Sequence, residues 1–195
     1  MKRYINPPEK IWNDLLERPV TDATVLFAQV QPVLDEIRQE GTKALKKYTE
    51  RFDGVSLDNF RVEAGELSQS VTTLDAGLKS AIEKAAENIF RFHQIQKPRI
   101  NRLETLPGVH CWQKAVPIEK VGLYVPGGSA PLFSTVLMLG IPAKIAGCRN
   151  IVLCSPPNSE GKVHPAILYA AKIAGISQIF KLGGVQAIGA MAFGT

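Results

Sequence analysis

The sequence predicts an α/β fold in which a helix-rich segment precedes an incomplete parallel β-sheet. After residue 120, three short apolar runs alternate with three helical patterns, and a turn rich in glycine or proline follows each run. Before residue 120, the chain is more charged and its apolar residues recur at helical spacing. Because apolar strands that alternate with helices are typical of a parallel sheet covered on both faces, we expect that architecture here.

The first expected helix contains a proline. Thr21 or Asp22 can cap its start, and Pro32 lies inside it, so the helix is either kinked at the proline or begins again there. Its apolar face is formed by residues three and four positions apart: Val30, Val33, Leu34 and Ile37.

Two further helices are expected before residue 120. One follows Gly41 and ends at the turn Asp53-Gly54, with an apolar face of Ala44, Leu45, Tyr48 and Phe52. A longer one follows Asp75 and ends before Pro98, with an apolar stripe of Leu78, Ile82, Ala85, Ile89 and Phe92. We expect these charged helices to lie as an outer layer on a sheet. Residues 108–120 alternate loosely, which predicts an extended, half-exposed segment.

The second part of the chain predicts three strands and three helices. The strands are expected at 121–125, 151–154 and 178–182, and the helices at 132–146, 164–174 and 185–193. Residues 121–143 carry no charge and are long enough to span a bilayer. Several prolines and glycines interrupt this stretch, so it cannot form one helix in lipid, and we expect a buried strand, a turn and a buried helix.

The series of strands and helices stops at Thr195, where a fourth strand is due. Rossmann-type domains use two such halves, so the sheet is an incomplete Rossmann-like one. The helical first part also lacks a sheet of its own. We therefore expect an N-terminal fragment of a longer protein, and we expect its open sheet edges to promote self-association.

Composition and charge exclude several classes of protein. The chain has 195 residues, 45% hydrophobic and 21% charged, which argues against disorder and coiled coil. Its net charge of +5 is dispersed and no nucleic-acid-reading motif accompanies it, so no nucleic-acid partner is expected. The N-terminus lacks a secretory signal, so we expect a cytoplasmic protein without a membrane partner. Cys111, Cys148 and Cys154 form no C-x-x-C pair, and the latter two are expected to be buried structural thiols.

Candidate binding residues follow the ends of the three predicted strands. The loops are Pro126-Gly127-Gly128-Ser129, Ser155-Pro156-Pro157 and Gly183-Gly184-Val185-Gln186. Ligands bind at the carboxyl ends of parallel strands, where glycines admit a close approach and helix N-termini offer free N–H groups to anions. The alternative is that these loops are only tight turns. No G-x-G-x-x-G follows a strand, and Ala190 stands where a P-loop needs its lysine.

Catalytic groups are scarce in the sequence. His93, His110 and His164 are far apart, and no G-x-S-x-G motif or metal-ligand spacing occurs. His93 is expected on the surface, and His164 is expected to cap a helix or lie on the surface. The residues alone therefore predict a ligand edge without a complete active site.

The chain resembles a known family over essentially its whole length. The segment VGLYVPGGSAPLFSTVLMLGIPAKIAGCRNIVLCSPP, which begins at Val121, resembles the central signature of the histidinol dehydrogenase family. The later KLGGVQAIGAMAFGT resembles the next block of that family. Three upstream segments match the family in order and spacing: RFDGV, NIFRFHQIQKP and PGVHCWQKAVPIEKVGLY. Family enzymes are more than twice as long, so the chain resembles their N-terminal portion.

The resemblance implies an NAD-dependent oxidoreductase. Family enzymes oxidise L-histidinol to L-histidine through the aldehyde in two NAD-dependent steps that end histidine biosynthesis. They are homodimers with one zinc per subunit, and a Glu-His pair transfers protons. Two side chains match NAD-contacting positions of the family, Tyr124 and Gln186. Tyr124 would offer a ring and a hydroxyl, and Gln186 an amide to ribose or phosphate. Otherwise Tyr124 packs on Pro126 and Gln186 caps a helix.

The other functional residues of the family have no match before Thr195. These are the zinc ligands, the Glu-His pair, the substrate contacts and a third NAD-contacting side chain, so we expect no catalytic residue, no metal ligand and no activity in this fragment. Family members have two Rossmann-like domains of an aldehyde-dehydrogenase-like type. By resemblance, residues 1–120 form the first, helix-rich part of a discontinuous domain, and residues 121–195 begin the second domain.

Two other functions stay open at this point. A non-catalytic nucleotide-binding or assembly module derived from the same fold would keep the strand-end loops without the catalytic half. A related dehydrogenase acting on another amino alcohol would share these motifs, because no residue here shows substrate specificity. The gene downstream of Thr195 distinguishes the first function from the enzyme, and substrate screening of the full-length protein distinguishes the second.

Overall fold

A parallel sheet lies at the centre of the protein. The computed structural model describes residues 3–18, 23–128 and 130–195. The sheet consists of β3 (Lys120–Tyr124), β4 (Asn150–Ser155) and β5 (Gln178–Lys181), in the order β3-β4-β5. Both neighbouring pairs are parallel. The predicted parallel sheet and the positions of its strands are therefore confirmed.

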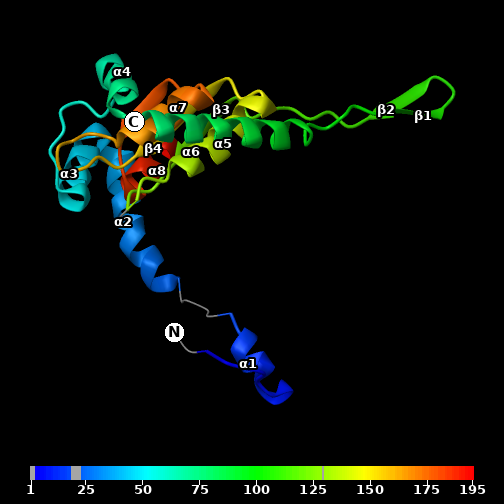
Figure 1. Ribbon diagram of the computed structural model, residues 1–195, viewed down its shortest axis with the longest axis horizontal. Coiled ribbons are helices and arrows are strands. Elements are labelled where there is room, and N and C mark those ends of the chain that lie inside the picture. The colour runs from blue at the N-terminus through cyan, green and yellow to red at the C-terminus, as the bar shows by residue number, and fades with distance from the viewer. Residues whose placement is uncertain (1–2, 19–22, 129) are drawn as a thin grey trace.

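Helices cover both faces of this sheet (Figure 1). The helices on the first face are α4 (Ala64–Thr73), α5 (Ala76–Gln94), α6 (Phe133–Ala146) and α7 (Pro165–Ala174). The helices on the second face are α2 (Thr24–Glu40), α3 (Thr42–Asp53) and α8 (Gly184–Phe193). Successive side chains of a strand point to opposite faces, so Leu153 of β4 enters the first core and Cys154 the second.

The two cores are built from the apolar faces that the sequence predicts. Ile82 of α5 and Leu137 of α6 are fully buried on the first face, and Ile37 of α2 is fully buried on the second. Burying an aliphatic side chain of this size contributes about 1.5–3 kcal/mol. Two predicted members are exposed: Phe52 is 51% exposed and Phe92 is 60% exposed. Each lies in the last turn of its helix.

The helix boundaries agree with the sequence signals. α2 continues across Pro32 as one helix, while Thr21 and Asp22 lie outside the described residues. α3 ends at Gly54, whose φ of 70° is the left-handed conformation that favours glycine. Asp75 caps α5 by accepting hydrogen bonds from the backbone N–H groups of residues 77 and 78.

A β-hairpin projects from the body of the protein (Figure 1). It consists of β1 (Arg102–Leu106) and β2 (Val109–Trp112), which pair antiparallel. All of residues 108–120 are exposed, so the expectation of a half-exposed segment was wrong. The hairpin packs on no described part of the sheet, which explains why its side chains lack a buried face. At the N-terminus, a short 3-10 helix (Glu9–Ile11) and α1 (Trp12–Leu16) also project from the body.

The first part of the chain also closes one edge of the sheet. Phe60 and Val62 exchange backbone hydrogen bonds with β5, through Lys181 N–H to the Phe60 oxygen at 2.7 Å and Val62 N–H to the Ile179 oxygen at 2.9 Å. Beyond this edge, Lys181 pairs with Glu66 of α4 at 2.8 Å. A segment of only three residues is too short to show a periodic pattern in the sequence, so this pairing could not be predicted.

Helices from before residue 120 therefore lie directly on the sheet that forms after it. The expectation that they form an outer layer is confirmed. The division at residue 120 into parts of two domains stays a prediction, and in the structure both parts contribute to both cores. No described helix is long and apolar enough to cross a membrane. The uncharged residues 121–143 instead form β3, a loop and most of α6.

The position of α8, the helix that follows β5, indicates where on the sheet a ligand can bind. α6 and α7 lie on one face, whereas α8 lies on the other and contacts β3. Among the described residues, β3 pairs only with β4, so its outer edge is open. A change of face at the first strand is the topological switch point of doubly wound sheets, where ligands bind beyond the carboxyl ends of the strands.

Candidate functional site

The three loops at the carboxyl ends of the strands contact one another. A Cβ placed on Gly127 would lie 2.7 Å from Cγ of Pro156, and one on Gly183 would lie 2.8 Å from Cβ of the same proline. Pro156, in the middle loop, is therefore wedged between the two outer loops, and a larger residue at either glycine would force them apart. Ser129 lies outside the described residues.

Tyr124 joins the first loop to the third. It ends β3 and is half-buried, and its hydroxyl oxygen accepts a hydrogen bond of 2.9 Å from the backbone N–H of Gly184. Gly184 is the first residue of α8 and has a φ of 47°. The predicted site residue thus lies at the expected strand end, and its hydroxyl is held against the N-terminus of the helix that carries the second predicted residue.

Gln186 lies in the first turn of α8 and is fully buried. Its Nε2 donates a hydrogen bond of 2.9 Å to Oδ2 of Asp53. Its Oε1 is buried without a hydrogen-bond partner. The alternative that Gln186 caps the helix is wrong, because Gly183 occupies the N-cap and no side chain caps it. A buried, unpaired acceptor costs about 1–3 kcal/mol, so a ligand that supplies a donor gains that much by pairing with it.

Asp53 is a site residue that the sequence analysis treated only as part of a turn. It ends α3, and besides Gln186 its carboxylate accepts a hydrogen bond from the Gly183 backbone. Burial raises the pKa of Asp53 above the ordinary value of 3.8, and the hydrogen bonds from Gln186 and Gly183 lower it in part. Spacing could not connect Asp53 with the third loop, because only the folded chain brings them together.

The helices behind the loops differ in how their N-termini are satisfied. His164 caps α7, and its Nδ1 accepts a hydrogen bond of 3.1 Å from the N–H of Ala166, so the expected capping role is confirmed. No side chain caps α6 or α8, and neither has an acidic residue in its first turn. Uncapped helix N-termini carry partial positive charge and attract anions. The N-terminus of α6 is therefore suited to a negatively charged ligand such as a phosphate, whereas at the start of α8 the Gly183 and Gly184 N–H groups already donate to Asp53 and Tyr124.

Acid–base and metal chemistry is not assembled within the described residues. No group of three His, Cys, Asp or Glu side chains in that part of the chain could hold a metal ion. His93 lies at the end of α5, where its Nδ1 contacts Oε1 of Gln96, and His110 lies on the hairpin. The expected surface position of His93 was only partly right, because its side chain is half-buried.

The cysteines lack the features of a nucleophile. Burial raises the pKa of Cys154 to about 12, so the thiol stays protonated at neutral pH. This confirms its expected structural role. Cys148, which was also expected to be buried, is only half-buried, and Cys111 is exposed.

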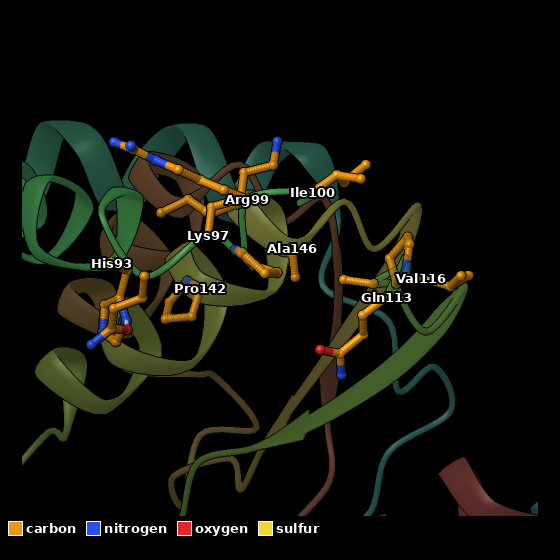
Figure 2. A pocket seen from close by; sticks show the side chains of 13 residues that line it. His93, Lys97, Arg99, Ile100, Gln113, Val116, Pro142 and Ala146 are labelled. Atoms are coloured by element: carbon orange, nitrogen blue, oxygen red, sulfur yellow. Dashed lines mark hydrogen bonds between the residues drawn. The ribbon is translucent and has the colours of Figure 1, made fainter. Parts of the chain in front are cut away.

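A hollow of about 360 Å³ lies between the end of α5, the base of the hairpin and α6. Figure 2 shows that the cationic ends of Lys97 and Arg99 point away from Pro142, which forms part of its wall. The surface inside the hollow is mostly apolar. It lies away from the strand-end loops and brings no predicted site residue together.

The comparisons with known proteins agree in naming one family. The family model described as "Histidinol dehydrogenase" matches residues 16–195. A histidinol dehydrogenase of Bacteroides thetaiotaomicron is 53% identical over 195 residues, covering 100% of this chain and 46% of the relative. One of Xylella fastidiosa is 47% identical, covering 94% of this chain and 45% of the relative.

A solved structure shares the fold as well as the sequence. The crystal structure of histidinol dehydrogenase from Elizabethkingia anophelis matches with a TM-score of 0.92 and 52% identity, over 98% of this chain and 44% of that one. The chain thus spans a little under half the length of these relatives. With the family model matched over nearly all of its residues and relatives about half identical to it, the chain belongs to the histidinol dehydrogenase family.

Proposed function

We propose that this chain is the N-terminal part of an NAD-dependent L-histidinol dehydrogenase and that it contributes a nucleotide-binding edge to the enzyme. The complete enzyme would oxidise L-histidinol to L-histidine through the aldehyde in the cytoplasm. Membership of the family supports the reaction. The observation that carries the binding role is the buried, unpaired Oε1 of Gln186 behind the glycine turn at the N-terminus of α8.

The described residues fit a dinucleotide at this edge. A Cβ placed on Gly184 would lie 3.0 Å from Oε1 of Gln186, so glycine at this position leaves the unpaired acceptor without a side chain crowding it on that side. The uncapped N-terminus of α6 suits a phosphate, and Tyr124 offers a ring at the rim. Tyr124, Gly184 and Gln186 would hold NAD, which accepts hydride when it is bound.

The chain's own contribution is binding and orientation. The hydrogen bond between Tyr124 and Gly184 fixes the turn in front of α8, and the bond between Gln186 and Asp53 fixes the side chain behind it. Pro156 keeps the middle loop packed between the two outer ones. A binding edge that is already ordered loses little conformational freedom when the ligand arrives, which favours affinity.

A zinc ion does not fit the described residues, since no three candidate ligands come together there. We therefore place the zinc ligands, the proton-transferring pair and the histidinol contacts of the complete enzyme outside this chain, and we propose a homodimer for that enzyme. The chain alone would bind NAD without oxidising L-histidinol.

A non-catalytic nucleotide-binding or assembly module is the second candidate. The observation that favours it is the combination of an ordered strand-end edge with no cluster of catalytic side chains among the described residues. The two candidates differ in the rest of the gene product, because only the enzyme requires a catalytic half.

Two assays test the proposal. NAD is titrated into the chain by calorimetry, and NADH production from L-histidinol is followed for both the chain and the protein as its gene encodes it. Saturable NAD binding by both, with NADH formed only by the complete gene product, supports the enzyme. Binding without NADH in either preparation supports the module. Absence of saturable binding by the complete gene product overturns the nucleotide edge.

A further inference from the structure

The orientation of the Gln186 amide follows from its partner. An ionised carboxylate only accepts hydrogen bonds, so the group of Gln186 that faces Asp53 must be Nε2, which donates to Oδ2 at 2.9 Å. A reversed amide would place two oxygens against each other in a buried position. Asp53 therefore determines that Oε1 is the atom of Gln186 left unpaired.

Asp53 is itself held in place from two sides. The Gly183 backbone donates a second hydrogen bond to its carboxylate. A Cβ on Gly183 would lie 2.7 Å from Oδ1, so only glycine lets the loop lie this close to the carboxylate. Two donors thus converge on one carboxylate, and this group joins the end of α3 to the third loop.

The unpaired oxygen lies beside Gly184. The three atoms nearest to a Cβ built there all belong to Gln186, and Oε1 is the nearest, at 3.0 Å. Glycine therefore leaves that side of the acceptor without a covering side chain, and a ligand group that reached Oε1 would meet an acceptor. A phosphate oxygen carries no hydrogen at neutral pH and would be repelled, whereas a hydroxyl would donate.

We infer that Asp53 is a positioning residue of the nucleotide site, which fixes the Gln186 amide so that Oε1 accepts a hydrogen bond from a sugar hydroxyl of the ligand. The inference rests on the proposed binding of NAD, and it narrows the partner of Gln186 from ribose or phosphate to a hydroxyl donor. Phosphate groups are left to the backbone N–H groups at the uncapped N-terminus of α6.

Substitution at Asp53 tests the positioning role in the protein as its gene encodes it. Asp53→Asn keeps the size of the side chain but offers one acceptor oxygen to two donors, so the Gln186 amide loses its fixed orientation. We expect NAD affinity to fall about tenfold, the usual effect of losing one such hydrogen bond. Asp35→Asn is the matched control, because Asp35 accepts a hydrogen bond of 2.8 Å from Gln31 on the exposed side of α2, and its affinity should stay unchanged.

A double-mutant cycle separates positioning from general damage to the fold. In a Gln186→Leu background, Asp53→Asn should cause no further loss of NAD affinity, because its effect acts through the amide. Additive losses would overturn the inference, as would equal NAD affinity of Asp53→Asn and Asp35→Asn. If the unsubstituted protein binds no NAD, the proposed function itself fails, which is a different result from binding that is insensitive to Asp53.

Deoxy analogues of NAD test the hydroxyl without any substitution, so the result does not depend on how the variants fold. Each analogue lacks one ribose hydroxyl. We expect one of them to bind the unsubstituted protein about tenfold more weakly than NAD, and Gln186→Leu to abolish that difference. Equal binding of NAD and of every analogue would overturn the assignment of Oε1 to a sugar hydroxyl.

Discussion

Gln186 and Asp53 are 133 positions apart in the chain, yet Nε2 of one donates to Oδ2 of the other at 2.9 Å. The bond connects the end of α3, in the charged first part of the chain, with the first turn of α8, beside the last strand. The helix-rich segment therefore does more than cover the sheet. It supplies the carboxylate that orients a buried amide at the proposed nucleotide edge.

The first prediction concerns the pH dependence of stability at Asp53. Its pKa is raised in the folded protein, so between 3.8 and the folded value the native state binds more protons than the unfolded state. The free energy of unfolding therefore falls as pH rises through that window. Relative to Asp53→Asn, which cannot titrate, the unsubstituted chain should gain stability as the pH is lowered towards 3.8. Urea unfolding at a series of pH values measures this difference, and a difference that grows with pH would contradict the account.

Cys154 provides a second prediction on the alkaline side. Burial raises its pKa from 9.0 to about 12, so above pH 9.0 the unfolded thiol loses its proton before the folded one. The contribution of Cys154 should be constant below that pH and should be lost as the pH rises towards 12. Cys154→Ala should show a shallower alkaline loss of stability. At neutral pH, a thiol reagent should label exposed Cys111 rapidly and Cys154 only on unfolding; rapid labelling of Cys154 in the folded chain would refute its burial.

The ion pair between Lys181 and Glu66 should stabilise the closed edge of the sheet. Their side chains are 11% and 24% exposed, and Nζ lies 2.8 Å from Oε1. Lys181→Met leaves the Glu66 charge without its cation, which we expect to lower the free energy of unfolding by about 3 kcal/mol. Lys162→Met is the control, since the Lys162–Glu160 pair is exposed and should contribute little. If urea unfolding shows that both variants lose the same free energy of unfolding, the buried pair does not stabilise the protein more than the exposed one.

Close packing of α6 on α7 predicts an unusual response to alanine. Alanine normally stabilises a helix relative to glycine by about 1 kcal/mol. At Gly140 of α6, however, a Cβ would lie 2.8 Å from Cδ1 of Ile176 and 3.0 Å from Cβ of Ala174. We expect Gly140→Ala to destabilise the chain by about 1–3 kcal/mol through overpacking. Gly65→Ala in α4, where a Cβ meets nothing within 4 Å, should be neutral or stabilising. Thermal melts compare the two, and stabilisation at both positions would refute the close packing.

The sequence predicts the centre of the fold well because buried elements leave a periodic signal. The three strands and the helices behind them follow from runs and stripes of apolar residues that the structure buries. The hairpin leaves no such signal, since its residues are exposed on both faces. Helix α4 is short and partly polar, and Ser70 is the one buried residue among its described side chains. Its apolar residues therefore show only a weak helical pattern in the sequence.

The candidate site is predictable in part for a related reason. Strand ends and glycine turns locate the three loops, including that of Gln186, because they are local features of the chain, whereas Tyr124 follows from the family resemblance. The role of Asp53 depends on a tertiary contact that no local spacing encodes, and its carboxylate lies in what reads as an ordinary turn. Likewise, the sequence indicates that Gln186 is available to a ligand but not which end of its amide is free.

The most direct test of the account is a titration of NAD into the ¹⁵N-labelled chain, followed through the backbone amides of Gly183 and Gly184 and the side-chain amide of Gln186. The account predicts saturable changes centred on these groups, with the resonances of the hollow near Pro142 unchanged. Saturable changes centred on that hollow, or no saturable change at the Gly183–Gln186 loop, would contradict the claim that these loops form the nucleotide edge.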